Sequence, residues 1–200
     1  MWARLESNTI VEILTRPKAL NIGGTQYPSN IFSMWSNSEL ATIGIVPVTI
    51  DNTNLKDKEY YINTNQSFAY DTETGVATAS YGTATAKPIA DILYTAQDET
   101  DGLGTEGEVR EYGLKHNHKE NINLQAAGNL QSTDWMIIRA ADGGTAVPSS
   151  ITTKRAAVRT KANAMQAQID AASDVPALMA LYVYNDATPP VRPLGELPTV

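Results

Sequence analysis

The chain of 200 residues contains no cysteine, which excludes disulfide bonds, thiolate zinc sites and cysteine nucleophiles. It has only two phenylalanines, and nine tyrosines carry most of its aromatic content. No stretch approaches the roughly 20 apolar residues of a membrane span, and the opening residues lack a basic segment before an apolar one. We therefore expect a soluble, unexported protein without a membrane partner.

The two signs of charge are unevenly represented, with 15 basic and 22 acidic residues and a formal net charge of -7. The basic residues form no stripe, and phosphate binding depends on clustered lysine and arginine, so we expect no nucleic-acid partner. Acidic residues concentrate near 96–110, where Asp98, Glu99, Asp101 and Glu106 could offer oxygens to calcium. Their order does not reproduce the spacing of a calcium loop, so a solvated charged loop is the better interpretation.

Residues 1–95 have the alternation of polar and apolar residues that is typical of strands. The opening stretch WARLESNTIVEIL predicts a hairpin that turns at Ser7-Asn8, and SFAYDTETGVATASY predicts another hairpin around Gly75. Pro47 interrupts IGIVPVTID, which indicates an edge strand or a strand end, because proline cannot donate to a ladder. This first part is therefore interpreted as a β-rich domain.

Two further signals lie in the first half of the chain. Ser36 and Glu39 have the spacing of a capping box and predict a short helix that ends before Gly44. The acidic, glycine-bearing stretch 96–110 has few residues able to bury area, and we interpret it as a linker or exposed loop.

Residues 111–185 change character and predict a helical domain, beginning with helical periodicity between residues 111 and 130. Trp135 lies in the short stretch DWMIIRAAD, which Thr133 or Ser132 could cap and Gly143-Gly144 could end. We interpret Trp135 as an anchor of the core. The alternative is a binding anchor, because tryptophan is enriched among the residues that dominate interfaces.

A longer helix follows Pro148 and carries one narrow apolar seam. The seam residues recur at intervals of four, three, four and three: Val158, Ala162, Met165, Ile169 and Ala172. Another helix could approach them closely, so the first four seam residues and Trp135 are the candidate binding residues. Ser173 or Asp174 could cap a last short helix. The proline-rich residues 186–200 predict an extended tail, either free or laid along a neighbour.

Four stretches, GLK, NLQSTDWMIIR, VPSSITTKRAAVR and DVPALMALYVY, resemble the C-terminal helical segment of bacteriophage tail-fibre assembly and tail-assembly chaperone proteins and related tail-associated virion proteins. The resemblance covers about residues 111–185. It rests on the order TDW, a helix break at VP, and the pair Arg155 and Arg159. The usual tyrosine- and arginine-bearing ending is absent, and alanine replaces several bulkier core residues.

The resemblance implies a non-enzymatic structural protein of the tail or tail fibre, the adsorption apparatus, that acts through protein–protein contacts. Its partners would be other phage tail or tail-fibre proteins, in a homo-oligomer or a symmetric multi-copy assembly. Its place would be the virion, after assembly in the host cytoplasm. The alternatives are a transient tail-fibre assembly chaperone, a capsid decoration protein and a glycan depolymerase, which would need a long repetitive β-helix region that the chain lacks.

No group of residues predicts catalysis or a cofactor. Asp71, Glu73 and Asp91 could serve glycoside cleavage, but they stand at turns or strand ends with nothing to mark a pair. His116 and His118 would face one side of a strand and offer a metal two ligands per chain. The surrounding pattern is helical, where two such side chains diverge by about 200°, so both remain weak metal candidates.

Overall fold

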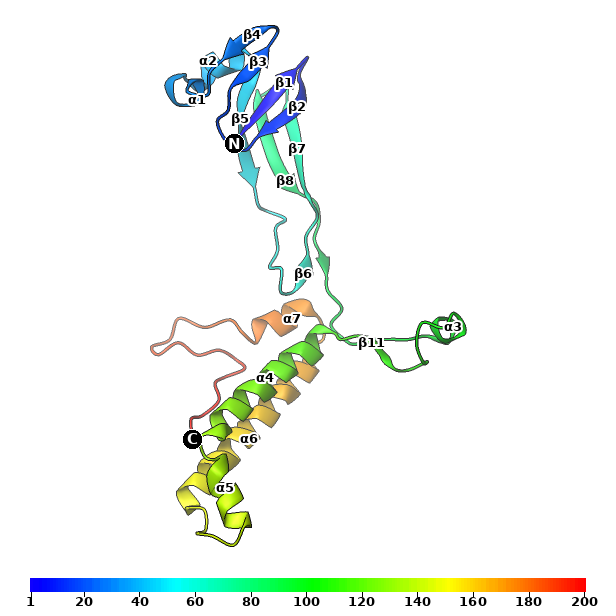
Figure 1. Ribbon diagram of the computed structural model, residues 1–200, viewed down its shortest axis with the longest axis vertical. Coiled ribbons are helices and arrows are strands. Elements are labelled where there is room, and N and C mark those ends of the chain that lie inside the picture. The colour runs from blue at the N-terminus through cyan, green and yellow to red at the C-terminus, as the bar shows by residue number, and fades with distance from the viewer. The chain divides into compact units, whose positions relative to one another are not determined.

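The computed structural model describes residues 1–200, which divide into two compact units, Met1–Thr85 and Ala86–Val200 (Figure 1). Strands dominate the first unit and helices the second, which confirms the mixed α+β class and the order that the sequence predicts. The division comes earlier than the expected boundary at residue 95. The reason is that residues before 95 bond to the start of the helical part, as when the Leu114 N–H donates to the Pro88 carbonyl.

The first unit is built around a five-stranded sheet with the strand order β2-β1-β5-β8-β7. Its elements are β1 (Trp2–Glu6), β2 (Thr9–Leu14), β3 (Leu20–Ile22), β4 (Thr25–Tyr27), α1 (Ile31–Met34), α2 (Asn37–Thr42), β5 (Ile45–Asp51), β6 (Tyr61–Ile62), β7 (Gln66–Asp71), β8 (Val76–Tyr81) and β9 (Thr85–Ala86). Neighbours in the main sheet are antiparallel except β5 and β8, which are parallel. The pairs β3–β4 and β6–β9 form two small sheets.

Both predicted hairpins are confirmed. Ser7 and Asn8 have φ angles of 49° and 65°, the left-handed conformation that lets a two-residue turn follow the twist of its strands. Gly75, with a φ of 72°, closes the hairpin between β7 and β8. The capping box at the start of α2 is also confirmed, because the Ser36 hydroxyl accepts from the Glu39 N–H and the Glu39 carboxylate accepts from the Ser36 N–H. These bonds from Ser36 lower the pKa of Glu39.

The prediction that Pro47 marks an edge strand is wrong, because β5 lies in the middle of the sheet. β5 changes partner along its length: Ile45 to Pro47 pair with β1, and Val48 to Asp51 pair with β8. The Val48 N–H donates toward β1, to the Met1 carbonyl. Because N–H groups alternate along a strand, the nitrogen of Pro47 faces the other side, where pairing with β8 has not yet begun.

The core of the first unit lies where one end of the sheet meets α1, α2 and the β3–β4 hairpin. Its buried members are Leu14, Leu20, Ile31, Leu40 and Ile45. Aromatic rings close its margin, with the Trp2 and Phe32 centroids 4.7 Å apart and the Tyr27 and Trp35 rings meeting edge to face at 5.8 Å. Several of the few large aromatic side chains of the sequence are thus concentrated in this one cluster of the first unit.

The second unit begins with a small loop system and continues as a helical hairpin. Its elements are β10 (Ile92–Leu93), α3 (Ala96–Thr100), β11 (Val109–Glu111), α4 (Leu114–Gln131), α5 (Asp134–Ala141), α6 (Ser149–Ala171) and α7 (Val175–Ala180). The stretch 96–110 is therefore more ordered than the expected linker. Thr95 and Asp98 form a capping box that starts α3, and β11 returns to pair with β10.

α4 and α6 lie side by side and form the body of the second unit (Figure 1). The seam of α6 is buried in this contact, with Val158, Met165 and Ile169 at 0% exposure. On α4 the buried positions recur every four residues, at Leu114, His118, Ile122 and Ala126. The seam is therefore covered by a helix of the same chain, and its residues are core positions of this fold.

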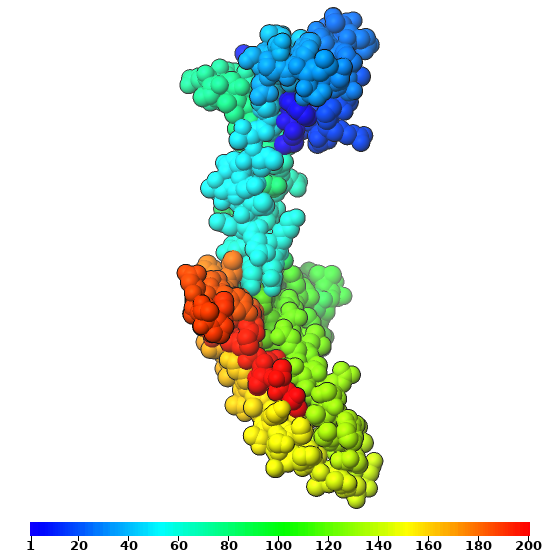
Figure 2. All heavy atoms as spheres, turned by 90° about the vertical axis from the view of Figure 1, so that its left-hand side faces the viewer, coloured from blue at the N-terminus to red at the C-terminus, as the bar shows by residue number.

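The proline-rich end of the chain folds back onto the helical hairpin, and Figure 2 shows its last residues in red lying against α4 and α6. Leu194 is completely buried. Its carbonyl accepts from the Lys161 ammonium at 2.8 Å, and its N–H donates to the Leu181 carbonyl at 3.0 Å. Because proline has no N–H, residues near 193–198 attach largely through their carbonyls, which accept from side chains of the helices.

Candidate functional site

α5 is the most exposed apolar element of the second unit. None of its eight residues is buried, and Trp135, Ile137 and Ile138 are 53%, 40% and 63% exposed. The interpretation of Trp135 as a core anchor is therefore wrong. α5 stands at the end of the helical hairpin opposite α7, and no further helix of the unit covers it (Figure 1).

Arg155, on α6, holds the start of α5 in place. Its guanidinium donates to the Leu130 carbonyl at 2.7 Å, to the Thr133 hydroxyl at 2.6 Å and to the Asp134 carboxylate at 2.7 Å. Arg155 is 7% exposed, so these charge-assisted bonds form in a poorly solvated place. The surface of α5 is thus attached to the α4–α6 body through a fixed network.

The expected capping by Thr133 is absent. Thr133 is the N-cap residue by position, but its hydroxyl donates to the Leu130 carbonyl at 3.0 Å and accepts from Arg155. The hydroxyl is therefore committed to closing the turn between α4 and α5. The predicted stop at Gly143-Gly144 is confirmed, since Gly143 has a φ of 82° and a side chain at Gly144 would meet the Arg139 carbonyl at 2.8 Å.

Arg155 is the residue of this site whose role sequence reasoning missed. Its spacing could have revealed this role, because Arg155 lies three residues before Val158 and so continues the alternating three- and four-residue intervals of the seam. A charged residue that continues an apolar seam must find partners at the end of the helix pair. Here its partners are the Leu130 carbonyl near the C-terminal end of α4 and the Asp134 carboxylate at the first residue of α5.

Arg139 adds an uncompensated positive charge to the same surface. Its guanidinium carbon lies 4.8 Å from the centre of the Trp135 ring, within the range of a cation–π contact. Its Nε is buried and has no hydrogen-bond partner, and no carboxylate forms an ion pair with it. The surface of α5 therefore combines exposed apolar side chains with an arginine that forms no ion pair within the chain.

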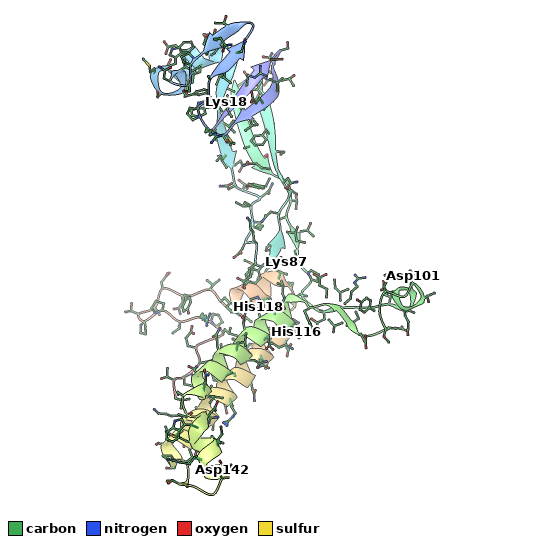
Figure 3. The ribbon with its side chains drawn as sticks, viewed as in Figure 1. Lys18, Lys87, Asp101, His116, His118 and Asp142 are labelled. Carbon is green, nitrogen blue, oxygen red and sulfur yellow. The ribbon has the colours of Figure 1, made fainter.

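The two histidines do not form a metal site. Both lie near the start of α4 (Figure 3), where His118 is buried and its ring lies 4.9 Å from the Tyr182 ring. His116 stacks on Tyr112 with centroids 3.8 Å apart, and its Nδ1 lies 3.8 Å from an oxygen of Asp91. No group of three or more histidines or carboxylates gathers closely enough to hold an ion. The helix directs the two rings to different neighbours, as its period requires.

Three of the carboxylates considered for catalysis or calcium binding, Asp71, Asp91 and Asp98, have structural partners. Asp71 accepts from the Thr74 hydroxyl and from the Glu73 N–H. Both bonds lower the pKa of Asp71, and the bond from Thr74 has the larger effect. Asp91 accepts from the Gly113 N–H at 2.7 Å, just before α4. Asp98 is occupied in the cap of α3. These carboxylates close turns and helix ends.

A second surface feature is an open hollow of about 560 Å³ in the C-terminal segment. Its lining is mostly apolar: Ala180, Val183, Tyr184, Asn185, Val191, Arg192 and Pro193. Unlike Arg139, Arg192 is compensated here, because Glu196 pairs with it at 2.8 Å. Glu196 also accepts from the Tyr184 hydroxyl, which raises the pKa of Tyr184.

Comparison with models of known protein families, with curated proteins and with solved structures found no match to this chain. None of its helices combines the length and the apolar character that crossing a bilayer requires. The arrangement of α5 and its supporting network is accordingly the strongest indication of what the chain does.

Proposed function

We propose that this chain is a non-enzymatic structural protein of a bacteriophage tail or tail fibre and acts through protein–protein contacts in the virion. The resemblance of residues 111–185 to tail-fibre assembly and other tail-associated proteins supplies the phage context. The exposed surface of α5 supplies the means of contact. In this proposal the protein is assembled in the host cytoplasm with other tail or tail-fibre proteins.

The observation that carries the proposal is the exposure of Trp135 on a helix that is fixed to the body of its unit. Tryptophan is among the residues that contribute most to protein interfaces when a partner covers them. A surface held by Arg155 loses little conformational entropy on binding, which favours association. Together, the exposed ring and its rigid support favour a binding role over a core role.

The protein is expected to remain with purified phage particles in a fixed number of copies. A structural component of the tail is held by permanent contacts, whereas an assembly chaperone leaves after its client has folded. Quantitative mass spectrometry of density-banded particles and of the infected lysate distinguishes the two. Absence from the particles combined with abundance in the lysate would overturn the structural role in favour of the chaperone.

Trp135→Ala is expected to prevent incorporation into particles while leaving the fold intact. Because Trp135 is half exposed, its removal creates no internal cavity and should lower the free energy of unfolding by no more than about 1 kcal/mol. The measurements are thermal unfolding of the purified variant and its copy number in particles. Leu124→Ala is the matched control, since Leu124 is 63% exposed on α4 and should leave both unchanged.

A further inference from the structure

We propose that the strap, residues 192–198, occupies a peptide-binding groove of the helical unit and can be displaced from it by a segment of another chain. The segment that this groove takes is extended and carries the order Pro-Leu-Gly, as the strap does at Pro193, Leu194 and Gly195. This inference goes beyond the proposed function, because it concerns a surface other than α5 and does not depend on the phage context.

The groove holds the strap mainly through its backbone. Side chains of two helices donate to three carbonyl groups of the strap. The donors are Lys161 and Gln168 on α6 and Asn129 on α4, at 2.8, 3.3 and 3.5 Å from the carbonyl oxygens of Leu194, Pro193 and Pro198. Proline favours an extended backbone and offers no N–H, so a proline-rich segment is recognised through its carbonyls and its apolar side chains. The same donors fit any segment that presents this backbone.

Leu194 and Gly195 make the groove selective. Leu194 is the one buried residue of the strap, with 0% exposure. Gly195 has a φ of 73°, and a Cβ added to it would lie 2.4 Å from the Lys161 ammonium nitrogen. A larger residue would therefore strain the backbone and push the ammonium away from the Leu194 carbonyl. The groove accordingly requires a leucine that is followed by a glycine.

The strap can leave the groove without the unfolding of a helix. Its other bonds lie within the segment that follows α7, as when Arg192 pairs with Glu196 at 2.8 Å or the Leu194 N–H donates to the Leu181 carbonyl. Residues 183–191, which lead to the strap, are all exposed, and Figure 1 shows them as a loop that leaves α7 and turns back. Release therefore moves only residues after α7, and the seam between α4 and α6 stays paired.

The unaltered chain keeps the groove largely covered by its own strap. Because the strap is tethered close to its seat, its effective concentration there is on the order of millimolar. A segment of another chain has to compete with this concentration, so weakening the strap should strengthen the binding of the competitor.

The test is fluorescence anisotropy of a labelled synthetic peptide of residues 190–200, titrated with the full chain. Leu194→Asp places a charge at the buried position and should unseat the strap. We expect the peptide to bind this variant with a dissociation constant on the order of 100 micromolar or tighter, and to bind the unaltered chain at least about tenfold more weakly. A peptide in which aspartate replaces the leucine should bind neither chain.

Two further substitutions in the Leu194→Asp chain locate the binding site. Lys161→Met removes the donor to the leucine carbonyl and should weaken peptide binding at least about fivefold. Lys154→Met is the matched control, because Lys154 is exposed on the same helix, and it should leave binding unchanged. Gly195→Ala in the otherwise unaltered chain loosens the strap without a buried charge and should also strengthen peptide binding.

Circular dichroism should show the Leu194→Asp and Gly195→Ala chains as helical as the unaltered protein. No binding of the peptide to these variants up to about 1 millimolar would overturn the groove. Equal affinity for the altered and unaltered chains would do the same, since the peptide would then bind elsewhere. Loss of helix in both variants would show that the strap is an integral part of the fold and cannot be displaced.

Discussion

Met165→Asp is expected to unfold the helical unit, lowering its free energy of unfolding by about 4 kcal/mol or more. Met165 has 0% exposure and lies in the seam of α6 against α4. A carboxyl group there loses its water and finds no partner, so it must either stay charged at high cost or take up a proton. Urea unfolding followed by helical circular dichroism measures the effect, because most of the helical residues belong to the second unit.

Two variants separate the burial of charge from other effects of the substitution. Met165→Leu keeps the volume and the apolar character, so it should cost less than about 1.5 kcal/mol. Ala164→Asp places the same carboxylate on the exposed side of α6 and should change stability by no more than about 0.5 kcal/mol. If Met165→Asp unfolds at the same urea concentration as Ala164→Asp, the seam is not buried and the α4–α6 packing is wrong.

Arg155→Met is expected to lower the free energy of unfolding of the helical unit by about 2 to 4 kcal/mol. Methionine can keep part of the packing of the aliphatic stem, but it removes the bonds to Leu130, Thr133 and Asp134. The Thr133 hydroxyl and the Leu130 carbonyl then lose a buried donor. The loss stays below that of a fully buried ion pair, because the Asp134 side chain is half exposed and regains water.

The same measurement on Arg159→Met provides the control, since Arg159 lies one turn further along α6 and is exposed. It should alter stability by no more than about 0.5 kcal/mol. Equal effects of the two substitutions would mean that Arg155 contributes no more than an ordinary surface arginine.

Several local features of this chain could be predicted because neighbouring residues determine them. Ser7-Asn8 and Gly75 accept the left-handed backbone that a hairpin turn requires. Ser36 and Glu39 cap each other's backbone donors whatever surrounds them. The seam on α6 follows from the helical period, and Asp174 accepts from the Ala177 N–H at the start of α7 as its position suggested. Such features depend on contacts only a few residues apart.

The places where prediction failed are those where a residue's surroundings come from distant parts of the chain. Pro47 is tolerated in a central strand because β5 changes partner at that residue, and no local pattern reveals which strands will lie on either side. The acidic stretch that resembled a linker is ordered by the cap of α3 and by the return of β11 to β10. Both outcomes depend on pairing across many residues.

The sequence by itself determined the α+β order, the hairpins, the start of α2, the end of α5 and the periodicity of the seam, because local backbone preferences and residue spacing decide these. The tertiary structure alone decided that the seam is covered by α4 and that Trp135 is exposed. An apolar helix looks the same in sequence whether or not another element covers it. Which elements pack together decides burial, and no other helix of the second unit covers α5, so Trp135, Ile137 and Ile138 stay exposed.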